Sequence, residues 1–181
     1  MDLDQFRAAA WSALLPQAIS DRIDARLAML ATVDGTGAPQ ARGVVIRSVD
    51  PARATVDVFT DAATQKCTEI IANPHVAMTL WREDVLLQIR LSGTMEMIEG
   101  KQARAAWDGL PDRALPDYGV TPPPATTIPA PDAYRRSPNA ARFAILRLTV
   151  ASMDVVSLHR PCHTRAHYWR ANDFAGEWRA P

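Results

Sequence analysis

The chain has 181 residues, of which 20 are lysine or arginine and 20 are aspartate or glutamate, so it carries no net charge at pH 7. This balance argues against a nucleic-acid partner, and no segment is apolar for long enough to span a membrane. Two cysteines in separate segments give no disulfide framework, and the N-terminus lacks the basic start and long apolar run of a signal peptide. We therefore expect a cytoplasmic protein that folds as a single domain over residues 1–181.

The N-terminal segment, residues 1–15, has the pattern of an amphipathic helix that Pro16 ends. Its apolar side chains recur at intervals of three and four residues: Leu3, Phe6, Ala10, Trp11 and Leu14. The pattern indicates a helix over residues 3–15 that packs on one end of the strands that follow.

Residues 27–49 predict a β-hairpin. An apolar strand over 27–33 leads into a glycine-containing turn at 34–37, and residues 38–49 return as a second strand. Because side chains alternate along a strand, Arg42, Val44 and Ile46 should lie on one face. Gly43, Val45 and Arg47 should lie on the other, so the two arginines leave opposite faces of the sheet.

Residues 55–60 predict a third strand, which runs directly into a helix over about 62–72 with Asp61 as the expected N-cap. The first-turn N–H groups of a helix have no intrahelical partner, so this junction suits an anion. Lys66 would lie in or just past that turn. A second interpretation is that Gln65 and Lys66 are ordinary solvated helix residues.

The remaining segments are strands, short helices and one long loop. Strands are expected over 76–82 and 85–98, a helix over 100–109, and two closing strands over 142–157. Prolines are dense over 110–138, which predicts an extended loop that Tyr118, Ile128 and Tyr134 can pin over a site. Arg135 and Arg136 are candidates for recognising a charged substrate, with a solvated pair as the alternative. This order of elements predicts an antiparallel barrel, not a Rossmann sheet.

Short motifs in this order resemble those of the pyridoxamine 5'-phosphate oxidase-like flavoproteins. They are Met29–Asp34, Gly37–Pro39, Arg42–Arg47, Phe59–Thr60, Thr64–Lys66, Asn73–Pro74 and Gln88–Gly93. The resemblance implies a mainly β fold, an antiparallel Greek-key split β-barrel with a few flanking helices. It also implies FMN as the cofactor and a homodimer in which two subunits jointly build two FMN sites.

Carried over residue by residue, the resemblance implies that Arg42, Gln65 and Lys66 surround the FMN phosphate and that Thr60 adds a hydroxyl. The backbone of residues 44–47 would lie along the flavin, and Gln88 would bind near its ring or ribityl chain. The cofactor-binding residues implied in this way are Arg42, Gly43, Val44, Val45, Ile46, Arg47, Phe59, Thr60, Gln65, Lys66, Gln88 and Arg165.

Three departures from the family pattern affect its implications. Gln65 stands where the family often has arginine, and Arg47 stands where the oxidase proper has a lysine that contacts substrate phosphate. The segment 158–169 matches the oxidases in composition but not in position, whereas the ending Trp178–Pro181 fits an oxidase-related branch of the family. Oxidation of vitamin B6 compounds therefore stays open but is not the favoured activity. Arg165 matches the second arginine of the family ending.

The histidine-rich segment allows three interpretations. His159, Cys162, His163 and His167 can be read as metal ligands, as a basic rim for cofactor or substrate, or as parts of a solvated loop. Pro161 interrupts any helix there, and residues 166–169 look like a strand, so we expect no metal site.

The resemblance implies an FMN-dependent oxidoreductase, by analogy an oxidase, that takes a hydride equivalent from a small-molecule substrate. The catalytic residue is not identified, although His163 and Arg165 are weak candidates. Two other functions stay open: a carrier or sensor that binds FMN without turnover, and a reductase that uses another flavin-like cofactor.

Overall fold

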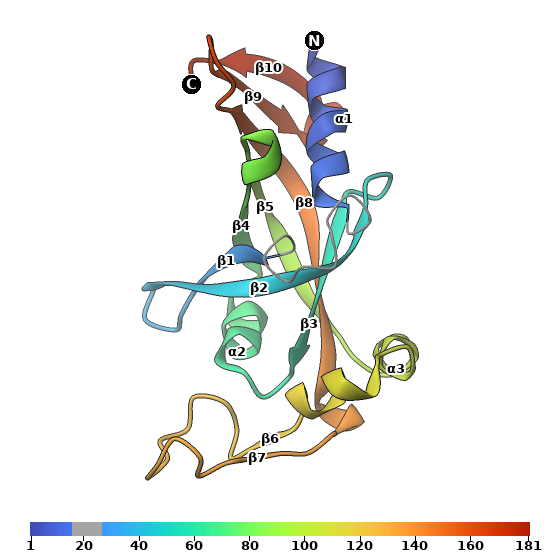
Figure 1. Ribbon diagram of the computed structural model, residues 1–181, viewed down its shortest axis with the longest axis vertical. Helices are drawn as coiled ribbons and strands as arrows, with labels where there is room; N and C mark the ends of the chain where they lie inside the picture. Colours follow the sequence, from blue (N-terminus) through green and yellow to red (C-terminus); the bar gives the residue numbers. More distant parts are fainter. Residues whose placement is uncertain (16–26) are drawn as a thin grey trace.

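The computed structural model describes residues 1–15 and 27–181. Its main sheet has eight antiparallel strands in the order β10-β9-β8-β3-β2-β1-β4-β5 (Figure 1). The strands are β1 (Leu27–Val33), β2 (Pro39–Asp50), β3 (Thr55–Asp61), β4 (His75–Arg82), β5 (Leu87–Ile98), β8 (Phe143–Ser157), β9 (Thr164–Trp169) and β10 (Ala175–Arg179). A further pairing of β8 with β5 closes six of them into a barrel. The predicted antiparallel split barrel is confirmed.

The long strand β8 explains how the barrel is both closed and split. Residues 143–149 pair with β3 on one side and residues 152–157 pair with β9, while β5 runs beside both halves. The register with β5 shifts next to Gly93, where an added Cβ would lie 2.0 Å from the Thr149 carbonyl oxygen. The expectation of two strands over 142–157 was therefore wrong: one strand continues through a bulge that its neighbour's glycine makes room for.

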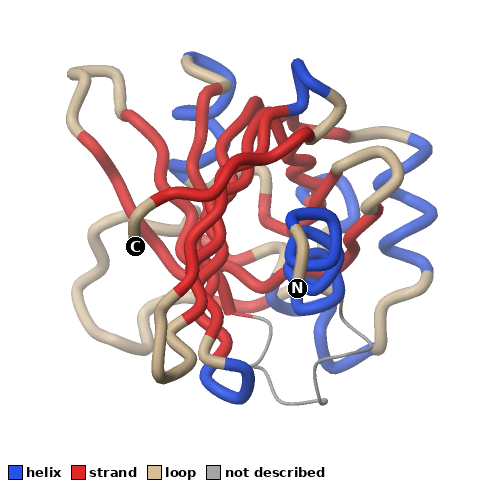
Figure 2. Tube along the Cα trace, turned by 90° about the horizontal axis from the view of Figure 1, so that it is seen from above, coloured by secondary structure: helices blue, strands red, loops and turns tan. Residues whose placement is uncertain are grey.

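Helix α1 (Leu3–Leu14) lies at the end of the barrel that carries β9 and β10. Asp2 and Gln5 form a capping box at its start, and the Tyr168 hydroxyl donates to the Leu3 carbonyl oxygen at 2.9 Å. Its buried side chains include Phe6, which confirms the predicted apolar face. Seen from above, this helix is viewed nearly end-on beside the strands (Figure 2).

Helix α2 (Gln65–Ala72) begins three residues later than expected, and Asp61 is not its N-cap. Thr64 takes the N-cap position. The Asp61 carboxylate instead accepts from the Ala63 backbone N–H at 2.9 Å and from Arg142 Nε at 2.9 Å. These two partners keep Asp61 at the end of β3, so residues 62–64 form a turn before the helix starts.

The segment 110–138 contains more structure than the predicted loop. After helix α3 (Lys101–Asp108), it includes a 3₁₀ helix (Asp112–Asp117) and two short paired strands, β6 (Val120–Thr121) and β7 (Arg135–Arg136). The expected anchor Tyr118 is buried and packs edge-on against Phe143 at 4.9 Å between ring centroids, whereas Tyr134 is exposed. Strand β10, which follows β9 at the end of the chain, was not predicted.

In the part of the chain that the structure describes, no helix combines the length and apolarity needed to cross a bilayer.

Candidate functional site

A buried carboxylate holds the side chain of Arg42. Arg42 Nη2 donates to Glu69 Oε2 at 2.8 Å, and Arg42 Nη1 donates to Thr32 Oγ1. Thr32 Oγ1 in turn donates to Glu69 Oε2 at 2.5 Å. Glu69 is only 4% exposed, whereas the Arg42 side chain keeps a quarter of its surface in solvent. Strands β1 and β2 and helix α2 each supply one member of this group.

A second group of donors lies at the start of α2. Lys66 Nζ donates to Thr64 Oγ1 at 3.0 Å, and the hydroxyl oxygens of Thr60 and Thr64 are 3.3 Å apart. Burial lowers the pKa of Lys66 from its ordinary value, and the positive charge of Arg42 acts in the same direction. Lys66 belongs to α2, the helix to which Glu69 also holds Arg42.

These two groups together form a donor set suited to a phosphate. Arg42 uses two of its five N–H donors on Thr32 and Glu69, which leaves three, and Lys66 uses one of its three. Among the described residues, the backbone N–H groups of Gln65 and Lys66 have no acceptor. Two cationic side chains and two free helix-start amides are the kind of group that binds a phosphate dianion.

The opposite face of the sheet carries a different part of the predicted site. The paired registers place one row of residues across seven strands: Gly43, Met29, Thr79, Arg90, Asp154, His167 and Glu177. The next row contains Trp81, Gln88, Val156, Arg165 and Arg179. Because paired residues share a face, Gly43, Gln88 and Arg165 look outward together while Arg42 points the other way. The predicted separation of Arg42 from Gly43 and Arg47 follows the same alternation.

Arg165 is held by a carboxylate of its own. Its Nε and Nη2 donate to the two oxygens of Asp154 at 3.0 and 2.7 Å. Arg90 Nη1 lies 3.8 Å and His167 Nδ1 lies 3.9 Å from Asp154 Oδ2. Burial opposes the charge of Asp154, but the hydrogen bonds and charge of Arg165, with His167 and Arg90, hold its pKa below the ordinary value.

The single chain does not bring all the predicted residues together. Thr60 pairs with Ala144 near the start of β8, whereas Gln88 pairs with Val156, twelve residues later on the same strand. Twelve extended residues span roughly 40 Å. Figure 1 shows β9 at the α1 end of the barrel and α2 toward the other end. Gln88 and Arg165, which flank Val156 in the register, are thus far from Thr60 and Lys66.

Arg47 and Phe59 contact each other away from the Arg42 group. The Arg47 guanidinium carbon lies 5.9 Å from the centroid of the Phe59 ring, and that ring packs edge-on against Phe143. Burial raises the pKa of the nearby Tyr118 hydroxyl, and the charge of Arg47 opposes that rise. Tyr118 of the segment 110–138 therefore lies beside Arg47. That this segment forms a wall over a site stays a prediction.

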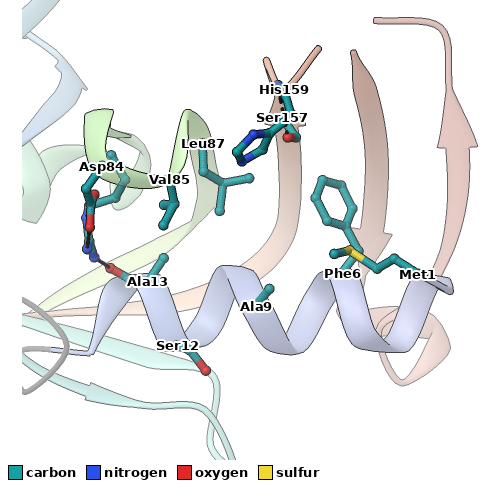
Figure 3. A pocket seen from close by; sticks show the side chains of 11 residues that line it. Met1, Phe6, Ala9, Ser12, Ala13, Asp84, Val85, Leu87, Ser157 and His159 are labelled. Atoms are coloured by element: carbon teal, nitrogen blue, oxygen red, sulfur yellow. Dashed lines mark hydrogen bonds and ion pairs between the residues drawn. The ribbon is translucent and has the colours of Figure 1, made fainter. Parts of the chain in front are cut away.

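A cavity of about 480 Å³ lies elsewhere, between α1 and the ends of β5 and β8 (Figure 3). Phe6, Val85 and Leu87 form apolar walls, and Ser157 and His159 lie at its polar side. None of the predicted cofactor-binding residues lines it.

The histidine-rich segment brings no metal-binding group together. His159, Cys162 and His163 are exposed, and His167 belongs to β9, where its ring stacks on Trp169 at 4.1 Å between centroids. Within residues 1–15 and 27–181, no three His, Cys, Asp or Glu side chains are grouped to hold a metal ion.

Comparison with known proteins places the chain in a family. The model of the pyridoxamine 5'-phosphate oxidase FMN-binding domain matches residues 8–99. The pyridoxine/pyridoxamine 5'-phosphate oxidase of Microcystis aeruginosa is 28% identical over 173 residues, which cover 88% of this chain and 78% of that protein. Proteins of the same name from Bordetella avium and Azorhizobium caulinodans match over 38% and 63% of their length, so the chain spans less than two thirds of these relatives.

Solved structures share the fold. A pyridoxamine 5'-phosphate oxidase-related, FMN-binding protein from Nostoc punctiforme has a TM-score of 0.81 at 24% identity, with both chains fully covered. PhzG from Burkholderia lata, solved with tetrahydrophenazine-1-carboxylic acid, has a TM-score of 0.74 at 20% identity over 99% of this chain and 90% of its own. An F420 reductase has a TM-score of 0.51 at 24% identity over 78% of this chain and 94% of its own.

The closed six-stranded barrel with its extra strands defines a protein of the split β-barrel class. The chain belongs to the pyridoxamine 5'-phosphate oxidase FMN-binding domain family.

Sequence reasoning missed the two carboxylates that hold Arg42 and Arg165. Glu69 follows Lys66 by three residues, so helical spacing alone would have put both on one side of α2. Asp154 is the single acidic residue of β8 and lies between Met153 and Val155, an unusual place for a charge without a partner.

Proposed function

We propose that this protein is an FMN-dependent oxidoreductase that acts on a small-molecule substrate. The observation that carries the proposal is the set of unused donors at α2: Lys66 and the free N–H groups lie at its start, and Arg42 is held to the same helix through Glu69. FMN ends in a phosphate dianion, and this donor set supplies the charge and the directed hydrogen bonds that such a group needs. Family membership supports the same cofactor.

The remaining predicted residues have roles on the outward face. In the proposed complex, the backbone of residues 44–47 lies along the flavin, and Gly43 presents no side chain beside Leu27. Gln88 and Arg165 supply polar contacts from the same face of a second subunit. Exposed apolar side chains on this face, Leu27, Met29 and Trp81, support the homodimer, because burying them would stabilise the association. Bound FMN supplies the redox chemistry, and the protein binds it, orients it and excludes water.

The direct test is a visible absorption spectrum of the freshly purified protein, with the released chromophore identified by mass. We expect stoichiometric FMN and a dimer in sedimentation. A protein that stays colourless after addition of FMN contradicts the proposal, and loading with a deazaflavin but not FMN would favour a reductase with another cofactor.

A second candidate function is a carrier or sensor that binds FMN without turnover. One observation favours it: Arg165, a candidate for proton handling, is tied to Asp154 by two hydrogen bonds, and the other candidate, His163, is exposed in a connecting segment. Failure of amine, alcohol and nicotinamide donors to reduce the FMN-loaded protein would support this function. Reduction by any of them would support the enzyme.

A further inference from the structure

The contacts of Arg42 point to a role for a residue that has none in the family motifs. Glu69 lies behind Arg42, is almost fully buried, and accepts from both Arg42 and Thr32 through the same oxygen, Oε2. Its other oxygen, Oε1, is buried and has no hydrogen-bond partner among the described residues.

We propose that Glu69 is a positioning residue that, together with Thr32, fixes the guanidinium of Arg42 in the orientation that receives a flavin phosphate. The inference rests on the proposed function and deepens it. Thr32 and Glu69 each take one N–H, one from Nη1 and one from Nη2, so the Nε–H and one N–H on each Nη stay free for a ligand.

A purely structural role explains Glu69 less well. An apolar side chain would fill the same space without leaving a buried carboxylate oxygen unpaired, and burying such an oxygen costs free energy. Holding Arg42 does explain it, because a free arginine side chain loses rotamer freedom when it binds a ligand, and an arginine that is already fixed loses less.

The negative charge of Glu69 opposes phosphate binding, whereas its hold on Arg42 favours it. A carboxylate near a bound dianion repels it, and the same carboxylate attracts Lys66 and Arg42. If repulsion dominated, removal of Glu69 would tighten FMN binding; if positioning dominates, removal weakens it. The sign of the change therefore decides between the two effects.

The first experiment compares FMN and riboflavin binding to the wild-type protein and to Glu69→Ala, Glu69→Gln and Thr32→Val, by flavin fluorescence titration. We expect Glu69→Ala to weaken FMN binding by about tenfold, the size expected when a charge-assisted contact is lost, with riboflavin nearly unchanged. Glu69→Gln keeps an acceptor oxygen and should recover part of the loss. Glu83→Ala, a charge-matched change at an exposed site, should alter neither ligand.

The second experiment does not depend on flavin. In the ligand-free protein, the ¹⁵N heteronuclear NOE of Arg42 Nε reports how rigid the guanidinium is on the fast timescale. We expect a rigid signal in the wild-type protein and a mobile one in Glu69→Ala, with weaker binding of inorganic phosphate in the variant.

The outcomes separate the inference from the proposed function. If the wild-type protein binds FMN but Glu69→Ala binds it equally or more tightly, or loses riboflavin equally, the inference is overturned and the function stands. If the wild-type protein binds no FMN, the function fails. The inference then survives only if Arg42 becomes mobile and phosphate binding falls in Glu69→Ala, and it is overturned otherwise.

Discussion

Two arginine–carboxylate pairs at opposite ends of the molecule differ in how completely the carboxylate is satisfied. Asp154 receives a two-pronged hydrogen bond from Arg165 and has Arg90 and His167 close by. Glu69 receives Arg42 and Thr32 through one oxygen only, and its other oxygen has no partner in the described part of the chain. A fully paired carboxylate stabilises the pairing of neighbouring strands, whereas a half-paired one costs stability, and the role proposed for Glu69 accounts for that cost.

The largest effect is expected at Gly93 of β5. This glycine lies beside the bulge that joins the half of β8 paired with β3 to the half paired with β9. An alanine there would place Cβ 2.0 Å from the Thr149 carbonyl oxygen, and both are backbone-bound atoms that cannot move aside cheaply. We expect Gly93→Ala to lower the free energy of unfolding by about 3 kcal/mol or more, measured by urea denaturation. If the free energy of unfolding fell by less than about 1 kcal/mol, the close approach of Gly93 to Thr149 would not be needed to join the two halves of β8.

The next largest effect is a difference between Arg42 and Arg165 in how their loss changes the binding of FMN and of riboflavin. Removing Arg42 deletes charge-assisted contacts to a phosphate, so Arg42→Ala should weaken FMN binding by about 2 kcal/mol or more and leave riboflavin nearly unchanged. Lys66→Ala should act in the same way. Arg165 lies on the outward face near the predicted contacts of the flavin ring. We expect Arg165→Ala to weaken the binding of FMN and of riboflavin equally. Titration of both flavins checks each variant, and equal losses of both in Arg42→Ala would break the comparison.

A smaller effect tests the role of Asp154 in stability. Its pKa is lower in the folded protein than in the unfolded chain, so its contribution is present above the unfolded pKa of about 4 and is lost as pH falls through the folded value. Asp154→Asn should cost about 1 kcal/mol near pH 7, a modest value because Arg165 is partly exposed.

Urea denaturation from pH 7 to pH 3 provides the measurement. The difference in stability between the wild-type protein and Asp154→Asn should shrink as the pH is lowered. A difference in stability that is constant over this pH range would contradict a stabilising role for the charge of Asp154.

The smallest effect is a pH dependence of FMN binding. Burial lowers the pKa of Lys66 below the ordinary 10.5, and only the protonated form attracts a phosphate. FMN affinity should therefore decline at a lower pH than an exposed lysine would give, and riboflavin affinity should not follow it. Lys66→Arg, which stays charged, should abolish the decline. A decline that persists in Lys66→Arg would assign it to another group.

Most strands and helices were predicted from local sequence patterns. The elements that were predicted wrongly share a physical cause. Alternation along residues 38–49 correctly separated Arg42 from Gly43 and Arg47, because a strand has a fixed period. The continuity of β8 and the turn before α2 depended on partners distant in sequence, namely Gly93 beside Thr149 and Arg142 beside Asp61. A single sequence does not reveal such pairings.

The candidate site, like the fold, was predicted from the sequence only in part. The order and spacing of short motifs predicted Arg42, Lys66 and Thr60. The structure groups Lys66 with Thr60 through Thr64 and holds Arg42 to the same helix through Glu69. The motifs said nothing of Glu69 or Asp154, since what a carboxylate pairs with depends on three-dimensional packing. The separation of Gln88 and Arg165 from this group also appears only in the register of β5, β8 and β9.

The ratio of dissociation constants for FMN and riboflavin on the wild-type protein tests the phosphate site most directly. The two ligands differ only in the phosphate, so the ratio isolates what Arg42, Lys66 and the start of α2 contribute. We expect FMN to bind about a hundredfold more tightly at low ionic strength, with the preference falling as salt is added. Equal affinities would contradict a phosphate site at α2 and with it the role proposed for Glu69.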